Sequence, residues 1–210
     1  MAAHRTAIEE TGHEYRLSLN MTVEEAVQDA TLVSNNTKNV RVTGGLTEYR
    51  VRSETQGTIR GTTTVEERDE WSNGSVRLLR TTQGDRTTYA RLSPLGQEGR
   101  AERESRLTEW LTLRDALAAG NFTVAEVSAD GSRITLTAEE PAPGTQNVSR
   151  FTGTVVVDDD GRIRRLTTRK VGTLEDGRAI AVDTRYRLLE TSVDGVERPD
   201  WFEQAMASQG

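Results

Sequence analysis

Closely spaced carboxylates are the residues of this sequence that most resemble a metal or acid-base site. Asp158, Asp159 and Asp160 precede Gly161, a spacing that resembles the start of a calcium-binding loop. The bidentate glutamate that completes an EF-hand is missing, and Asp-Gly favours a hairpin turn, so a turn is the preferred interpretation. A second acidic run, residues 66–70, is expected at a solvated strand end, because nothing there indicates the burial that raises a carboxylate pKa.

The sequence contains few candidate residues for histidine-based or nucleophilic catalysis. The only histidines, His4 and His13, stand near the N-terminus without further ligands at metal-binding spacing, so we expect both on the surface or in turns. No nucleophile elbow, Ser-x-x-Lys motif or phosphate-binding glycine loop is present, and there is no cysteine. We therefore expect no enzyme activity, no metal and no cofactor.

The composition indicates a thin core and an unusual surface. The chain has 210 residues, of which 34% are hydrophobic and 5% aromatic, which suits a sheet with one wet face. Its net charge is −6, and Lys38 and Lys170 are its only lysines, so salt adaptation is expected, although a GC-rich genome would also replace lysine with arginine. The acidic balance and the lack of a basic run argue against nucleic acid and against a polybasic membrane contact.

One segment has the spacing of a helix. Residues 105–119 carry apolar side chains at intervals of three and four, with Ser105 as a candidate N-cap and Gly120 as a candidate terminator. We expect this helix to cover one face of a sheet. Trp110 lies on it, and together with Trp71 and Trp201 it is expected either to pack in the core or to line an apolar pocket.

The remaining chain favours strands. In residues 180–188, apolar side chains alternate with charged ones, which is the period of a half-buried strand. Turns at Asp130, Asp160 and Asp176, each followed by glycine, predict a meander after the helix, and similar turns predict another before it. Residues 23–33 fit either a helix or a long hairpin arm. We predict one domain, residues 1–210, with a mainly β (α+β) fold: a large curved antiparallel sheet with helices on its concave face.

Asparagine usage points outside the cytoplasm. Five of the seven asparagines stand in Asn-x-Ser/Thr sequons, more than chance predicts, although threonine-rich strands next to turns also generate sequons by accident. The glycosylation candidates are Asn20, Asn35, Asn73, Asn121 and Asn147.

The order of elements also resembles a known family. An N-terminal helix, a long meander, an inserted helix and a second meander with the pattern V-x-V-D-x-D-G-x-I-x-x-L at residues 155–166 resemble the half-barrel lipoprotein carriers of the LolA and LppX/LprG type. His4, the segment Tyr15-Arg16-Leu17 and residues 196–201 are similar to haloarchaeal surface lipoproteins of unknown function. The resemblance implies a signal peptide and a lipid-bearing cysteine upstream, a cell-surface location with membrane contact only through that anchor, and a bound lipid.

Two non-catalytic functions follow as expectations, and a hydrolase with an unrecognised site is kept as a third hypothesis. The first is a non-catalytic module that holds a lipid or another hydrophobic small molecule between the helices and the sheet. The second is a cell-envelope interaction protein with a filled core, no ligand, and an outer Arg/Glu face that meets partners. For the first, the candidate lining residues are Leu17, Leu19, Leu107, Trp110, Leu111, Ile180, Val182 and Tyr186.

Overall fold

A computed structural model, which describes residues 2–24, 31–93 and 99–208, shows one open antiparallel sheet of eleven strands. The strands are β1 His13–Glu24, β2 Thr31–Val42, β3 Glu48–Ile59, β4 Thr62–Asn73, β5 Arg77–Gln83, β6 Arg86–Arg91, β7 Thr123–Val127, β8 Arg133–Ala138, β9 Val148–Asp158, β10 Ile163–Thr173 and β11 Ala179–Glu190. The helices are α1 Ala2–Thr11, the 3₁₀ turn η1 Gly44–Leu46, α2 Arg100–Thr108, α3 Trp110–Ala118 and α4 Phe202–Ala207.

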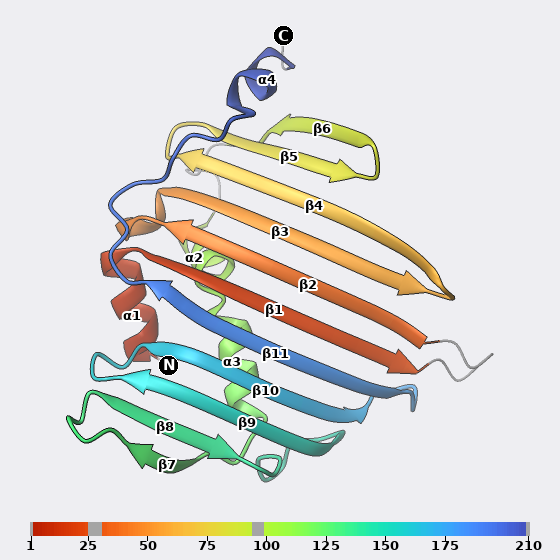
Figure 1. Cartoon of the computed structure of the whole chain (residues 1–210), viewed down its shortest axis with the longest axis vertical. Coiled ribbons are helices and arrows are strands. Elements are labelled where there is room, and N and C mark those ends of the chain that lie inside the picture. The colour runs from red at the N-terminus through yellow and green to blue at the C-terminus, as the bar shows by residue number, and fades with distance from the viewer. Residues whose placement is uncertain (1, 25–30, 94–98, 209–210) are drawn as a thin grey trace.

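The topology joins two meanders at the middle of the sheet. The strand order is β6-β5-β4-β3-β2-β1-β11-β10-β9-β8-β7, so the first and last strands of the chain's β region pair with each other. The sheet is curved and does not close, and α2 and α3 lie behind it in Figure 1. The predicted fold class, a curved antiparallel sheet with helices on its concave face, is confirmed.

The main core occupies the sheet face that α1, α2 and α3 cover, which we call the helix face. Alternation decides which side chains reach it, because successive strand residues point to opposite faces. One row of buried side chains crosses four neighbouring strands through Val155, Leu166, Tyr186 and Leu17. Leu107 and Leu113 of the two helices pack against this face and are fully buried.

The hairpin predictions are confirmed where the structure describes them. Gly131, Gly161 and Gly177 follow the three aspartates and take positive φ angles of 71°, 76° and 85°, which glycine adopts without a Cβ penalty. For residues 23–33 the hairpin arm is correct, since β1 and β2 pair as far as Glu24 and Thr31. Residues 25–30 lie outside the described residues.

The predicted helix 105–119 is wrong in its bounds, because the structure has two helices there. α2 begins at Arg100, so Ser105 lies inside it and is no cap. Glu109, with φ 52° and ψ 24°, ends α2 in the left-handed conformation and begins α3. Gly120 is no left-handed terminator either, since Ala119 is the C-cap of α3. Packing explains why this residue is a glycine, because a Cβ at position 120 would lie 2.2 Å from the ring of Phe151.

A lysine on the sheet explains why the helix breaks at Glu109. The ammonium group of Lys38, which points to the helix face, donates to the carbonyl oxygen of Arg106 at 2.7 Å and pairs with the Glu109 carboxylate. A cation at the last turn of a helix satisfies free carbonyl groups and complements the helix dipole. Thr112 then donates to the second carboxylate oxygen of Glu109 at 2.8 Å. These contacts offset the cost of a left-handed non-glycine residue.

Lys38→Met should therefore destabilise the fold by about 2 kcal/mol, because it leaves the Glu109 carboxylate in a mostly buried site without its cation. Urea denaturation at neutral pH measures this difference. The matched control is Lys170→Met, which removes the other lysine, a residue without an ion pair among the described residues. Equal effects of the two substitutions would contradict the role of Lys38.

Both histidines are buried, which corrects the expectation of surface residues. His13 lies between α1 and α2, where its ring nitrogens stand 3.0 Å from the Ile8 carbonyl oxygen and 3.1 Å from that of Leu107. Nδ1 of His4 accepts the Ile163 amide at 3.1 Å, and its ring packs edge-on to Tyr186. Burial, together with the nearby charge of His13, lowers the pKa of His4 from 6.5 to about 3.

This shift predicts acid sensitivity. Between pH 6.5 and about pH 3 the unfolded chain binds more protons at His4 than the folded protein does, so stability falls as the pH drops through that window. His4→Phe keeps a ring against Tyr186 but removes the titrating group, and it should cost about 1 kcal/mol at neutral pH through the lost Ile163 acceptor. The difference in the free energy of unfolding between wild type and His4→Phe should become smaller when denaturation is measured at about pH 4.5. A gap that does not change with pH would contradict the assignment.

Candidate functional site

The side chains predicted to line a lipid cavity all belong to the helix side of the molecule but do not form one wall. Leu17, Leu107 and Tyr186 are buried in the main core, where they contact other protein atoms. Leu19 and Val182 line a hollow of about 220 Å³ beside α3, together with Phe151 and Ala116 among others. The structure therefore brings two of the eight predicted residues to a common cavity.

The other predicted lining residues lie apart from that hollow. Trp110 is half-buried at the start of α3, and the guanidinium groups of Arg5 and Arg114 stack on its ring at 5.6 and 5.1 Å. Leu111 is 39% exposed, and Ile180 is half-buried at the start of β11. The three tryptophans do not converge, because Trp71 and Trp201 share a separate cluster around α4.

That second cluster marks the opposite face of the sheet, which we call the polar face. After β11, residues 191–201 run past the ends of β1 to β4 and lead into α4, which lies next to β5 and β6 at the top of Figure 1. We call residues 191–201 the strap. The Val193 amide donates to Thr11 at 3.3 Å, and Nε of Arg41 donates to the Gly195 carbonyl oxygen at 3.4 Å. The buried ring of Trp201 ends the strap.

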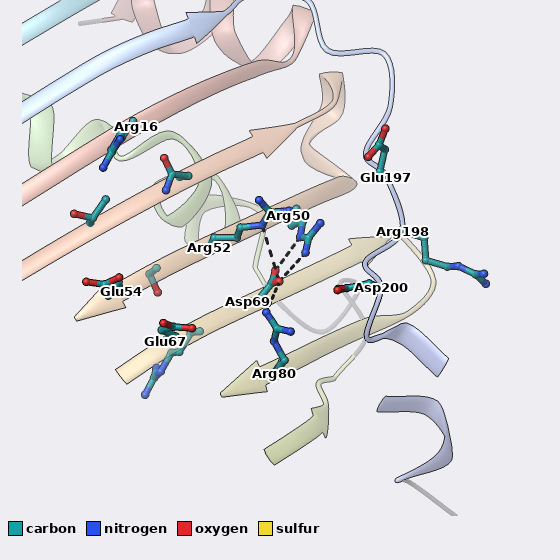
Figure 2. A pocket seen from close by; sticks show the side chains of 14 residues that line it. Arg16, Arg50, Arg52, Glu54, Glu67, Asp69, Arg80, Glu197, Arg198 and Asp200 are labelled. Carbon is teal, nitrogen blue, oxygen red and sulfur yellow. Dashed lines mark hydrogen bonds and ion pairs between the residues drawn. The ribbon is translucent and has the colours of Figure 1, made fainter. Parts of the chain in front are cut away.

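One buried carboxylate holds the end of the strap to the sheet. Asp69 of β4 is 5% exposed and accepts the indole Nε1 of Trp201 at 2.8 Å. Arg50 donates to both of its oxygens, at 2.9 and 2.7 Å, and Arg80 donates at 3.4 Å. Arg52 stands 4.0 Å away (Figure 2). We call these five residues the Asp69 cluster.

The charges around Asp69 control its ionisation. Burial alone would raise the pKa of this carboxyl, but hydrogen bonds from Arg50 and Trp201 and the charges of Arg50 and Arg52 outweigh it and lower the pKa below 3.8. The expectation of a solvated acidic run is therefore wrong for Asp69. It is also wrong for Glu70, which points to the helix face and binds Arg77 at 3.0 Å. Alternation along β4 sends the two carboxylates to opposite faces.

The strap and the polar face enclose two hollows of about 750 Å³ each. Asn39, Arg50, Arg52 and Glu197 line both of them, so the hollows meet beneath the strap. We call this pair of hollows the strap groove. Its lining is mostly charged and hydrogen-bonding side chains, and Figure 2 shows Glu197, Arg198 and Asp200 on the strap side of the first hollow. The groove is suited to a polar ligand.

Few features of the sequence indicate this site. Trp71 and Trp201 mark the two sides of the α4 cluster, and the acidic run contains Asp69, but neither feature points to the other. Their meeting depends on a strap that returns 132 residues after Asp69. The pairing of β4 with β3 and β5, which sets Arg52 and Arg80 opposite Asp69, completes the cluster.

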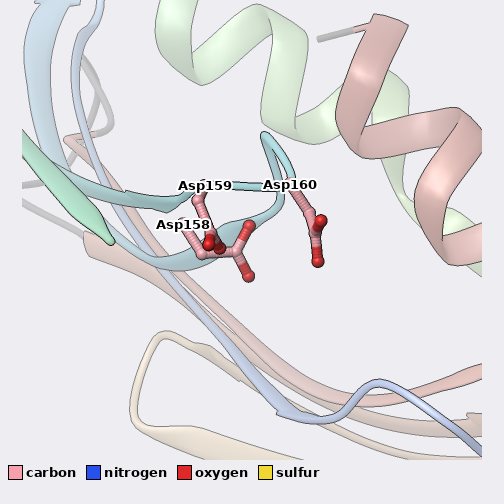
Figure 3. A group of neighbouring side chains, drawn as sticks. All are labelled: Asp158, Asp159 and Asp160. Atoms are coloured by element: carbon pink, nitrogen blue, oxygen red, sulfur yellow. The ribbon is translucent and has the colours of Figure 1, made fainter. Parts of the chain in front are cut away.

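The aspartate triplet forms a turn, as predicted. Asp158, Asp159 and Asp160 bring carboxylate oxygens within 4.8 Å of one another at the turn between β9 and β10 (Figure 3). Oδ1 of Asp158 accepts the Arg162 amide at 2.8 Å, and the Arg162 side chain pairs with Asp160. Two of the three carboxylates thus have partners within the turn itself.

The predicted sequons occupy two regions. Asn20 and Asn35 stand opposite each other on β1 and β2, both half-buried. Asn73, Asn121 and Asn147 are exposed outside strand interiors or at strand ends. Among the described residues, no helix has the length and apolar character needed to cross a bilayer.

Comparisons with known proteins add little. No protein-family model matches the chain, and no curated protein sequence matches it. Among solved structures, the crystal structure of a DUF1329 family protein from Desulfovibrio piger is similar over 98% of this chain and 97% of that chain, with 13% sequence identity and a TM-score of 0.30. A likeness at this level carries no functional argument.

The Asp69 cluster yields a prediction with a defined pH dependence. Asp69→Asn should destabilise the protein by about 3 kcal/mol at neutral pH, because it removes the negative charge that Arg50 needs in this buried site. The folded-state pKa is lowered, so this stabilisation is present above pH 3.8 and is lost as the pH falls through the folded value. The difference from wild type should therefore shrink in urea denaturation at about pH 3.

The matched control for this experiment is Asp183→Asn. Asp183 lies on the same face and pairs with Arg169 at 3.0 Å, but it is more exposed, so its loss should cost less than about 1 kcal/mol. Equal losses of stability in the two variants at neutral pH would show that the buried Asp69 stabilises the fold no more than an exposed aspartate does.

Proposed function

We propose that this protein is a non-catalytic binding module that holds a polar, hydrogen-bonding ligand or partner in the strap groove. One observation carries the proposal: the two hollows beneath the strap measure about 750 Å³ each, whereas the hollow beside α3 measures about 220 Å³. Small-molecule sites usually measure about 300 to 1,000 Å³. The face that protein atoms fill is thus the helix face, and the face with room is polar.

The chemistry of the groove supports a polar ligand. Asn39 and Thr37 offer hydrogen bonds from β2, and Arg52 and Glu197 add charges of both signs from opposite walls. Arg52 is more than half exposed and stands at the edge of contact with Asp69, so its guanidinium can turn to a ligand. An acyl chain would gain nothing from these groups, since they lose hydration without gaining partners.

A second candidate is the lipid-binding function that the sequence suggested. The hollow beside α3 supports it, because Leu19, Val182, Phe151 and Ala116 give it an apolar wall. For lipid binding, one end of an acyl chain would enter the hollow beside α3, and α3 would move outward to admit the remaining part of the chain.

We also propose that the protein works outside the cytoplasm. Five sequons support this proposal, and the three exposed ones, Asn73, Asn121 and Asn147, leave space for a glycan. The lipid anchor and the haloarchaeal origin suggested by the sequence remain predictions.

Cavity-filling variants separate the two functions. Asn39→Trp places a large ring in the strap groove, and Ala116→Trp fills the hollow beside α3. Thermal unfolding is measured with wild type and both variants against two probe sets, one of short peptides and oligosaccharides and one of fatty acids. We expect a polar probe to raise Tm in wild type and in Ala116→Trp but not in Asn39→Trp, because only the last fills the polar site.

The reverse pattern decides against the proposal. Stabilisation by a fatty acid that survives in Asn39→Trp and disappears in Ala116→Trp would establish the lipid function instead. Stabilisation by polar probes that is equal in all three proteins would place their binding outside the groove.

A further inference from the structure

Four arginines stand next to one another at the centre of the polar face, on strands β1, β10 and β11. Arg187 lies directly opposite Arg16 on one side and Arg165 on the other. Arg185 follows on the same strand two residues away, and all four side chains are exposed. We call Arg16, Arg165, Arg185 and Arg187 the arginine quartet.

No ion pair or side-chain hydrogen bond of the described residues involves any member of the quartet. Other arginines of the same face do have carboxylate partners: Arg41 binds Glu14 and Glu190, Arg50 and Arg80 bind Asp69, and Arg169 binds Asp183. The chain has 33 acidic and 27 basic side chains, so carboxylates are not scarce. Unlike these paired arginines, the quartet has no carboxylate partner among the described residues.

This arrangement costs stability in the free protein. Directly opposite strand residues have Cβ atoms about 5 Å apart, and like charges at that spacing repel. Arg187 has a like charge on both sides. A bound anion would relieve this repulsion, so the quartet gains more from an anion than an isolated surface arginine does.

We propose that the arginine quartet is a binding site for a small, multiply charged oxyanion, a phosphate or sulfate group on a small molecule. Guanidinium groups bind such oxygens through two parallel N–H donors, and several around one group match its charge. The quartet lines a shallow hollow of about 420 Å³ with Ser18 and Thr167, whose hydroxyl groups flank Arg185 and add donors. Among the residues that the structure describes, no acidic side chain lines this hollow.

The surroundings favour a small anion over an extended one. Glu54, Glu67 and Asp183 lie on the same face around the quartet, and the chain as a whole carries a net charge of −6. A nucleic acid or an anionic membrane would have to approach these carboxylates as well, whereas a compact anion meets only the four arginines. This site uses residues other than those that carry the strap-groove proposal, apart from Arg16 at their border.

The test uses inorganic pyrophosphate as the probe, measured by isothermal titration calorimetry on the full chain at low ionic strength. We expect binding to wild type, a loss of affinity of about tenfold or more in Arg187→Gln and in Arg185→Gln, and weakening with added salt. The matched control is Arg169→Gln, which removes an exposed arginine of the same face that already has a carboxylate partner; its affinity should stay within about twofold.

The quartet variants should fold, because removing like-charge repulsion leaves Tm unchanged or raises it. Equal losses in Arg169→Gln and Arg187→Gln would show attraction by general charge and overturn the site, as would no pyrophosphate binding to wild type. Vesicles that contain anionic phospholipid form a second arm: binding to them through the quartet, without binding of free pyrophosphate, would overturn the small-anion assignment in favour of a lipid headgroup. Glu197→Gln, which changes a wall of the strap groove but does not line the hollow of the quartet, should leave pyrophosphate binding intact, so the two proposals fail separately.

Discussion

The packing of one apolar sheet face against three helices is the interaction on which this structure depends. The chain supplies few hydrophobic residues, and alternation along the central strands gathers them on the side of α1, α2 and α3. Tyr15, Tyr186 and Leu107 fill that side with their own atoms. Too few hydrophobic residues then remain to pack a covering layer on the second face, and charged side chains organise that face instead.

Two mostly buried carboxylates show how charge positions the elements that packing alone does not fix. On the helix face, Glu109 accepts Lys38 and sets the break between α2 and α3. On the polar face, Asp69 accepts hydrogen bonds from Trp201, Arg50 and Arg80, with Arg52 at 4.0 Å, and sets the end of the strap. In both cases a mostly buried carboxylate links a strand to a covering element and depends on the cations beside it, because their loss leaves an uncompensated charge. The arginine quartet lies between such satisfied pairs and lacks one of its own.

Local patterns allowed much of the fold to be predicted from the sequence. The alternation in β11 identified its buried side, and Asp-Gly turns identified the second meander, because both signals depend on neighbouring residues. The helix break could not be predicted in this way, since the spacing of residues 105–119 is helical throughout and the cause lies on β2. The burial of His4 and His13 likewise follows from contacts with β10 and α2 that no local pattern records.

The candidate sites were less predictable for the same reason. Asp69 stands in an acidic run that is typical of a solvated edge, and only strand register and a distant tryptophan show that it is buried. The quartet combines side chains from three strands whose positions in the chain differ by up to 171 residues, 187 minus 16. Each of its arginines, taken alone, has the pattern of an ordinary strand residue that points to solvent.

The most direct test of the account is a high-resolution crystal structure of the protein purified from a lipid-containing host. The account predicts that the space between the sheet and α2 and α3 contains only the protein's own side chains, with Leu107 and Leu113 in place against Tyr186 and its neighbours. Elongated electron density of an acyl chain in that space, with these leucines displaced, would contradict a filled core and place the ligand site on the helix face.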